Sequence, residues 1–286
     1  MLTNSFPLCL ITMAFIWFSM SAARAETQVE RGKYLMDGIV ACGNCHTPKG
    51  PDDSSPVADM ELAGGYVIVT PMFRAVVPNI TLDKETGIGN WTDDQIIDAI
   101  RNGKRPDGTT IGPPMPIAFY RDMSDSDVRA IVTYLHTVKP IHHVVVEKST
   151  YKNPLPSSYG PVVNQVPDVP STDKVVYGHY LATALGHCID CHTPLVQGKN
   201  DMTRVGQGRL QPGPFGKPVM SANLTTANPS GIASWTDEQV ETAIAQGIRP
   251  DRPLVRLMAF DWYKNISSAD LKALVAYLRT LKPSMP

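Results

Sequence analysis

Two segments of the chain repeat the pattern Cys-x-x-Cys-His-Thr-Pro, at residues 42–48 and 188–194. Two thiols three residues apart lie on the same face of a helical turn, so both can bond to a single partner. Four chemistries use such a pair: a disulfide, a zinc site, a thioredoxin-like redox centre, and the attachment of haem c through two thioether bonds. A zinc site needs four ligands and the pattern supplies three at most, while a redox pair needs no following histidine. The histidine therefore favours haem c.

The doubled pattern predicts two covalently bound haem c groups, each with its iron. In each copy the two cysteines would bond to the porphyrin, and the next residue would point its imidazole at the iron. The chain has five cysteines, and only Cys9 lies outside the two copies. The expected attachment residues are Cys42, Cys45, Cys188 and Cys191, and the expected proximal iron ligands are His46 and His192.

A methionine is expected to bind each iron from the opposite side. Met115 and Met258 have matched surroundings in the two copies, because each precedes by nine residues the serine expected to begin the last helix. A methionine taken singly is more often a core residue than an iron ligand, and the duplicated position reverses that expectation. The other methionines considered correspond poorly between the copies: Met60, Met72, Met123, Met202 and Met220.

The histidines outside the two motifs are expected to be ordinary surface or core residues. His142 and His143 have no counterpart in the other copy, and His136, His179 and His187 match residues of other types. Most histidines in such positions are not iron ligands.

The order of landmarks around each motif is also repeated, which indicates two domains of one fold. RGKYL at 31–35 matches YGHYL at 177–181, and NWTDDQI at 90–96 matches SWTDEQV at 234–240. The proline-rich segment between the copies is expected to form an extended linker that lies across one or both domains. The expected division is a signal peptide at 1–25, a first domain at 26–140, a linker at 141–171 and a second domain at 172–286. We call residues 26–140 the first repeat and residues 172–286 the second repeat.

Each repeat is expected to be all-α, with three main helices. Thr92 and Gln95 form a capping box at the start of the middle helix, and the second repeat has the same residue types in place. The last helices begin at Ser124 and Ser267 and carry apolar residues at helical spacing. The loops between the helices are long for domains of this size, as expected if they surround a large cofactor.

The N-terminal segment is typical of a secretory signal peptide. A mostly apolar run from Phe6 to Met20 is followed by Ala23-Arg24-Ala25, a small-x-small cleavage pattern. We expect cleavage after Ala25 and export to the periplasm. No Lys or Arg precedes the apolar run, so an uncleaved N-terminus is the alternative, and membrane association is otherwise expected to be peripheral.

The charge balance argues against nucleic-acid binding. The 26 Lys and Arg residues nearly equal the 27 Asp and Glu residues, so no basic field is available for a phosphate backbone. Weak, charge-guided docking to protein partners is expected instead, although the net charge does not identify the docking face.

The motifs together resemble those of di-haem class I cytochromes c, and most closely the cytochrome subunits of periplasmic alcohol and gluconate dehydrogenases. The resemblance covers nearly all of the chain after residue 25. It implies two tandem class I cytochrome c domains, in which the methionine before the last helix binds iron. It also implies that the first and last helices of each domain cross at Gly32 with Tyr134 and at Gly178 with Tyr277. Those relatives commonly carry three haem motifs and a C-terminal membrane-binding helix, whereas this chain has two motifs.

The expected function is transfer of single electrons from a periplasmic dehydrogenase to a cytochrome or oxidase of a respiratory chain. Histidine and methionine together occupy both axial positions of the iron, which favours electron transfer over binding of O₂ or peroxide. On this reading the chain has no catalytic residues and is a non-catalytic electron carrier or the cytochrome subunit of a dehydrogenase complex. The alternative is an enzyme resembling di-haem cytochrome c peroxidase, which needs one iron open to its substrate.

Overall fold

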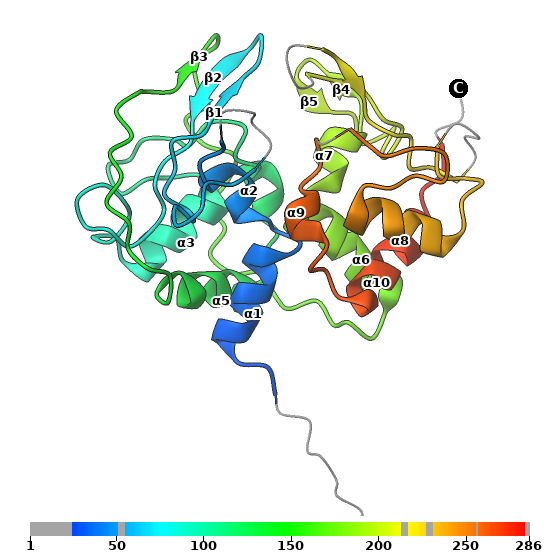
Figure 1. Ribbon diagram of the computed structural model, residues 1–286, viewed down its shortest axis with the longest axis horizontal. Coiled ribbons are helices and arrows are strands. Elements are labelled where there is room, and N and C mark those ends of the chain that lie inside the picture. The colour runs from blue at the N-terminus through cyan, green and yellow to red at the C-terminus, as the bar shows by residue number, and fades with distance from the viewer. Residues whose placement is uncertain (1–24, 51–54, 213–216, 227–230, 256, 284–286) are drawn as a thin grey trace, which may run out of the picture.

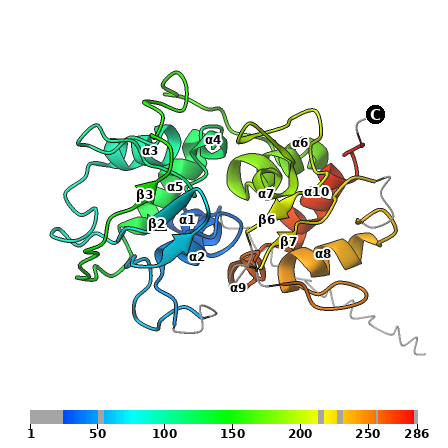
Figure 2. The same cartoon turned by 90° about the horizontal axis from the view of Figure 1, so that it is seen from above.

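The computed structural model describes residues 25–50, 55–212, 217–226, 231–255 and 257–283, so that nearly all of the expected signal peptide lies outside the described residues. The two repeats lie side by side (Figure 1 and Figure 2). The first repeat and linker contain α1 (Gln28–Asp37), α2 (Cys42–His46), β1 (Val67–Val69), β2 (Phe73–Val76), α3 (Asp93–Asn102), α4 (Ile117–Tyr120), α5 (Asp125–Leu135) and β3 (Thr150–Tyr151). The second repeat contains α6 (Lys174–Tyr180), the π-helix η1 (Leu181–Leu185), α7 (Cys188–His192), β4 (Leu195–Val196), β5 (Lys199–Asn200), β6 (Leu210–Gln211), β7 (Val219–Met220), α8 (Asp237–Gln246), α9 (Phe260–Tyr263) and α10 (Ser268–Leu278).

The first and last helices of each repeat cross at a glycine, which confirms what the resemblance implied. A β-carbon added at Gly32 of α1 would lie 1.9 Å from a backbone carbonyl oxygen of α5, and one at Gly178 of α6 would meet α10 at the same distance. The β-carbons of Tyr134 and Tyr277 lie at the same two crossings. Only glycine lets the helix backbones approach this closely.

The middle helices α3 and α8 begin as predicted. The Thr92 side chain accepts a hydrogen bond from the Gln95 backbone, and the Gln95 side chain accepts one from the Thr92 backbone. Thr236 and Gln239 form the same reciprocal pair in α8. Both helices end at a glycine in the left-handed conformation, which glycine adopts without steric penalty. The serine caps predicted for α5 and α10 are also present.

The fold is not all-α, which corrects the prediction from sequence. About 33% of the described residues are helical, and the same residues form three small antiparallel sheets, β1-β2-β3, β4-β5 and β6-β7. In residues 66–77, β-branched side chains cluster on both sides of a turn closed by a 2.8 Å hydrogen bond from Thr70 N to Phe73 O. Such residues favour extended backbone, and two runs joined by a turn form a hairpin. The prediction assigned only helices and long loops between them, and so it did not include this hairpin.

The linker lies across the first repeat. Its strand β3 pairs with β2, which makes the linker the third strand of the first sheet. Farther along, Val163 exchanges two hydrogen bonds with the side chain of Asn102 at the end of α3, at 2.9 and 3.2 Å. Val166 does the same with the backbone and side chain of Asp125 at the start of α5. These contacts fix the extended linker against the first repeat at both ends.

One cluster of buried hydrophobic residues runs through both repeats. Leu35 and Ile131 contribute to it from the first repeat, and Leu181 and Leu274 from the second. Within the described part of the chain, none of the helices combines the length and the apolar character needed to cross a bilayer.

The boundary between the repeats is built twice from equivalent hydrogen bonds. Tyr34 of α1 donates to Asp270 at 2.7 Å and accepts from Ser267 N at 3.1 Å, both at the start of α10. Tyr180 of α6 donates to Asp127 at 2.7 Å and accepts from the backbone N of the serine that caps α5, at 3.0 Å. Burial raises the pKa of both tyrosines, so both hydroxyls stay protonated and act as donors. We call this pair of contacts the tyrosine clamp.

Replacing Tyr34 and Tyr180 by phenylalanine is expected to weaken the association of the repeats. Each substitution removes a hydrogen bond to a carboxylate, which contributes about 1.5–3 kcal/mol. The double variant should therefore lower the free energy of unfolding and split one calorimetric transition into two. Tyr159→Phe is the matched control, because it removes a 2.8 Å hydrogen bond to Ile111 O that does not involve the second repeat. A double variant that unfolds in one transition at the wild-type temperature would show that the tyrosine clamp does not hold the two repeats together.

Candidate functional site

Each Cys-x-x-Cys-His pattern forms a single short helix, α2 in the first repeat and α7 in the second. All four cysteines in these helices are free thiols with partly accessible side chains. The next residue in each motif is a buried threonine that accepts a backbone hydrogen bond from the following loop. Thr47 Oγ1 accepts from Leu62 N at 3.1 Å, and Thr193 Oγ1 accepts from Gly206 N at 3.3 Å. The loop is thereby held against the end of the helix.

The histidine of each motif is oriented by a backbone carbonyl. His46 Nδ1 lies 3.0 Å from Pro78 O, and His192 Nδ1 lies 2.8 Å from Ala222 O. A carbonyl oxygen only accepts, so Nδ1 carries the proton and Nε2 keeps its lone pair. Burial lowers the pKa of both histidines, which favours the neutral ring that binds metals. A hydrogen bond from the ring nitrogen that does not bind the metal is the usual way in which proteins fix a histidine ligand.

The thiols are unlike those of redox or zinc sites. Burial raises the pKa of Cys42 and of Cys188 to about 12. A redox-active cysteine acts as a thiolate, and its pKa is lowered by its surroundings. Within the described residues, no group of three or more His, Cys, Asp or Glu side chains is placed to hold a metal ion. The surroundings therefore fit neutral thiols that become thioethers.

The expected methionine ligands occupy equivalent places. Met115 and Met258 are both partly buried against the hydrophobic cluster, and each backbone carbonyl accepts a 2.9 Å hydrogen bond from the first residue of the short helix that follows. Among the alternatives, Met202 and Met220 are 62% and 66% exposed, whereas Met123 is fully buried in the core. Exposed positions do not suit an iron ligand, and Met123 is enclosed by other hydrophobic side chains of the core.

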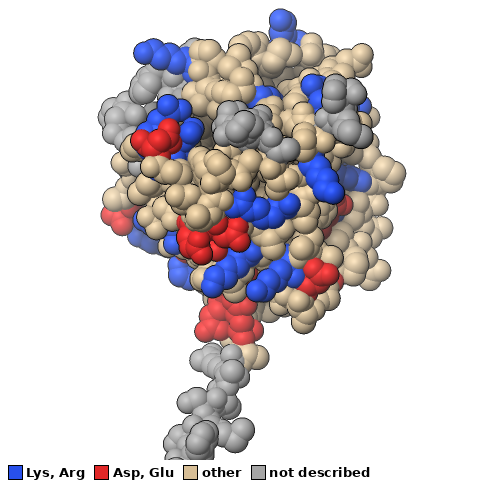
Figure 3. Space-filling model, turned by 90° about the vertical axis from the view of Figure 1, so that its right-hand side faces the viewer, with Lys and Arg blue, Asp and Glu red and all other residues tan. Residues whose placement is uncertain are grey.

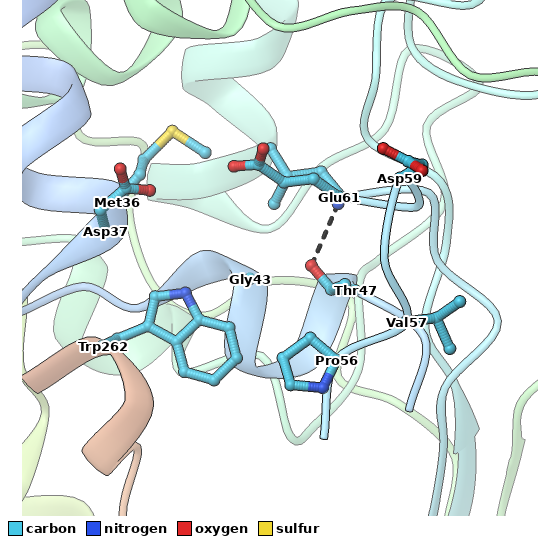
Figure 4. Close-up of a pocket in the computed structure, with 10 residues that line it drawn as sticks. Met36, Asp37, Gly43, Thr47, Pro56, Val57, Asp59, Glu61 and Trp262 are labelled. Atoms are coloured by element: carbon cyan, nitrogen blue, oxygen red, sulfur yellow. Dashed lines mark hydrogen bonds between the residues drawn. The ribbon is translucent and has the colours of Figure 1, made fainter. Parts of the chain in front are cut away.

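The short helices α4 and α9, which follow the two methionines, reach across to the opposite repeat. The ring of Tyr120 in α4 packs edge-on against His187, directly before α7, with 5.9 Å between ring centroids. Trp262 of α9 lies against α2, where a β-carbon added at Gly43 would be 2.8 Å from its indole nitrogen. Figure 4 shows Trp262 beside Gly43 at a cavity of about 190 Å³ that is otherwise lined by residues of the first repeat. The surroundings of each motif are therefore completed by the other repeat.

Sequence reasoning missed these cross-repeat contacts and the carbonyl partners of the histidines. The carbonyls belong to the backbone and leave no signal in residue type. The tyrosine clamp did leave a signal, because Tyr34 and Tyr180 occupy matched positions in the duplicated segments.

The sequence profile of the cytochrome c family matches residues 29–139 and 176–282, which is most of each repeat. The chain belongs to the cytochrome c family. Two matched segments and a di-haem relative establish two covalently bound haem c groups. The free thiols, neutral histidines and paired methionines described above fit such groups.

Similar proteins include cytochrome subunits of dehydrogenases. The chain is 31% identical to the fructose dehydrogenase cytochrome subunit of Gluconobacter japonicus, over 91% of this chain and 54% of that protein. It is 30% identical to the cytochrome c subunit of a quinone alcohol dehydrogenase of Gluconobacter oxydans, over 94% and 58%. A di-haem cytochrome c of Cereibacter sphaeroides is 28% identical, over 83% and 81%. The chain thus spans just over half the length of the first two relatives. The resemblance to dehydrogenase cytochrome subunits is confirmed, and these relatives support electron transfer.

Proposed function

We propose that this cytochrome accepts single electrons from a dehydrogenase and passes them to a respiratory acceptor. In this proposal residues 26–140 and 172–286 are two haem domains joined by the linker at 141–171. Residues 1–25 are a signal peptide that is removed during export to the periplasm. The proposed attachment residues are Cys42, Cys45, Cys188 and Cys191, the proposed proximal iron ligands are His46 and His192, and the proposed distal ligands are Met115 and Met258.

The observation that carries the proposal is the repeated orientation of the two histidines. In both repeats Nδ1 is held by a backbone carbonyl, at 3.0 and 2.8 Å, which leaves Nε2 free to bind a metal. The same helix presents two neutral thiols, and a partly buried methionine precedes a short helix in the same relative position.

Haem c, when bound, supplies an iron that changes between ferric and ferrous forms one electron at a time. The residues of this chain keep that centre closed to other reagents. With a histidine and a methionine of this chain holding each iron, no coordination position would remain for O₂ or peroxide. The contact from Nδ1 to a backbone carbonyl restrains each histidine in this orientation. This arrangement supports electron exchange with little rearrangement, and it is the reason for preferring a carrier over a peroxidase.

The two repeats differ in charge, which suits two different partners. Residues 26–140 carry 16 Asp and Glu against 11 Lys and Arg, whereas residues 172–286 carry 9 against 12. Lys and Arg side chains are spread over the outer face of the second repeat (Figure 3). Opposite charges would steer the donor and the acceptor to different ends of the molecule, since weak redox complexes are guided by charge.

The proposal is tested by mixing the oxidised protein, without oxygen, with quinoprotein, flavoprotein and molybdenum dehydrogenases and their substrates. We expect one of these to reduce both haems rapidly, at a rate that falls with added salt. The dehydrogenase without its substrate is the control. Failure of every dehydrogenase to reduce the protein, or turnover of peroxide by the reduced protein, would refute the proposal.

A further inference from the structure

Two buried tyrosines occupy matched positions at the boundary between the repeats. Tyr120 is the last residue of α4 and Tyr263 is the last residue of α9. Each follows the proposed methionine ligand of its repeat, Met115 or Met258, by five residues. The two tyrosines are only 5% and 8% exposed. The duplication therefore places an enclosed aromatic ring at the same point of both repeats.

Tyr120 reaches from the motif of its own repeat to the motif of the other repeat. Its hydroxyl lies 3.5 Å from the carbonyl oxygen of Val40, two residues before Cys42. Its ring packs edge-on against the imidazole of His187, with 5.9 Å between the ring centroids. His187 directly precedes Cys188. One aromatic side chain therefore contacts the segments that lead into both haem-attachment helices.

Tyr263 lies near the thiols of both motifs. Burial is the main cause that raises its pKa, and two thiols of the second motif and one of the first raise it further. The pKa of Tyr120 is raised by burial, then by the two thiols of the first motif and by Tyr263. The residue before Tyr263 also contacts the first motif, because a β-carbon added at Gly43 would lie 2.8 Å from the indole nitrogen of Trp262. The two tyrosines are thus neighbours between the motifs.

This placement matters because the cysteine sulfurs are the atoms through which haem c is joined to the chain. A ring packed against both motifs continues that connection from one repeat to the other. Electron tunnelling weakens more steeply across empty space than through packed atoms. Aromatic rings in edge-on contact, as Tyr120 and His187 are, supply such a packed medium.

We propose that Tyr120 and Tyr263 form an aromatic bridge through which electrons pass between the two haems. One electron leaves the iron of one haem and reaches the iron of the other, so one iron is oxidised as the other is reduced. No bond is made or broken, and neither tyrosine loses an electron or a proton. The rings serve only as the medium. This inference rests on the proposed electron-transfer function and adds the route inside the molecule.

The test measures electron exchange inside the purified protein with both haems bound and no partner present. All samples carry Met258→His, because imidazole in place of the proposed thioether ligand lowers the potential of the second haem. After a radiolytic pulse has reduced part of the haem, absorbance follows the electrons as they move to the first haem. Replacing both tyrosines by leucine should slow this movement, whereas replacing both by phenylalanine keeps the rings and should keep the rate.

A leucine pair no slower than the phenylalanine pair would overturn the inference. If the leucine pair fails to retain its haems, Tyr120→Leu and Tyr263→Leu are each compared with the single phenylalanine variant at the same position. Tyr159→Leu is the matched control and should leave the rate unchanged, because the Tyr159 hydroxyl bonds to Ile111 O within the first repeat.

A second readout locates the rings without measuring a rate. The same Met258→His protein is oxidised in two steps, and the ring resonances of labelled tyrosines are followed by nuclear magnetic resonance. The signals of Tyr120 and Tyr263 should shift in both steps, because each ring lies between the two motifs. Signals that respond to only one haem would contradict the bridge. Because no dehydrogenase takes part, these results are independent of the test of the proposed function.

Discussion

Replacing Cys42 and Cys45 together by serine is expected to leave a protein with one covalent haem instead of two. A serine hydroxyl cannot form the thioether bond through which haem c is attached. The second motif lies in its own helix with its own histidine, so it should still be filled. Mass spectrometry of the denatured chain should show the loss of one haem, and the absorbance of extracted haem per chain should fall by half.

The matched variant replaces Cys188 and Cys191 by serine and should also leave one haem. The unmodified protein prepared in parallel is the control, and it should carry two haems. Covalent attachment of two haems in either double variant would show that the motifs do not each hold one.

Alanine at Gly32 is expected to disrupt the crossing of the first and last helices in the first repeat. The added β-carbon would lie 1.9 Å from Ala130 O, a backbone atom that cannot rotate away. Relief requires the two helices to separate, which exposes apolar residues such as Leu35 and Ile131. Overpacking of this kind costs about 3 kcal/mol or more. Chemical denaturation of the holoprotein should show this decrease in the free energy of unfolding. Gly178→Ala should cause a similar decrease through the helix crossing of the second repeat.

The control for the glycine variants is Gly108→Ala. A β-carbon there meets nothing within 4 Å, although its φ of +81° is unfavourable for alanine. Only the backbone preference should lower the free energy of unfolding in this variant, by about 1–2 kcal/mol. If Gly32→Ala proved no more destabilising than Gly108→Ala, the close approach of α1 and α5 would not be what requires glycine at position 32.

The helices were predictable because their signals are local. The capping pair Thr92 and Gln95 marks the start of α3 in the sequence, and the structure places it there. The hairpin in residues 66–77 was missed because the prediction assigned only helices and loops, although β-branched residues favour extended backbone. The side of the molecule that the linker covers was not predictable, since that depends on partners such as Asn102 and Asp125 that are far away in the sequence.

For the site, the sequence was sufficient to propose the cysteines, the histidines and the paired methionines, because the duplication supplies its own comparison. It did not reveal the role of the linker. His143 was expected to be an ordinary residue. Its imidazole fills the space beside Gly65 where a side chain at that position would begin. Nor does the sequence reveal that two nitrogens of Arg209 are buried without a hydrogen-bond partner. Both observations depend on three-dimensional packing.

The central claim is that both irons are closed on both sides by side chains of this chain. The most direct measurement is a low-temperature electron paramagnetic resonance spectrum of the ferric protein, with haem quantified in the same sample. We expect two haems per chain, all low-spin, and a near-infrared thioether-to-iron band that Met115→Ala and Met258→Ala each reduce by half. A high-spin ferric signal amounting to one haem per chain in the unmodified protein would contradict the account.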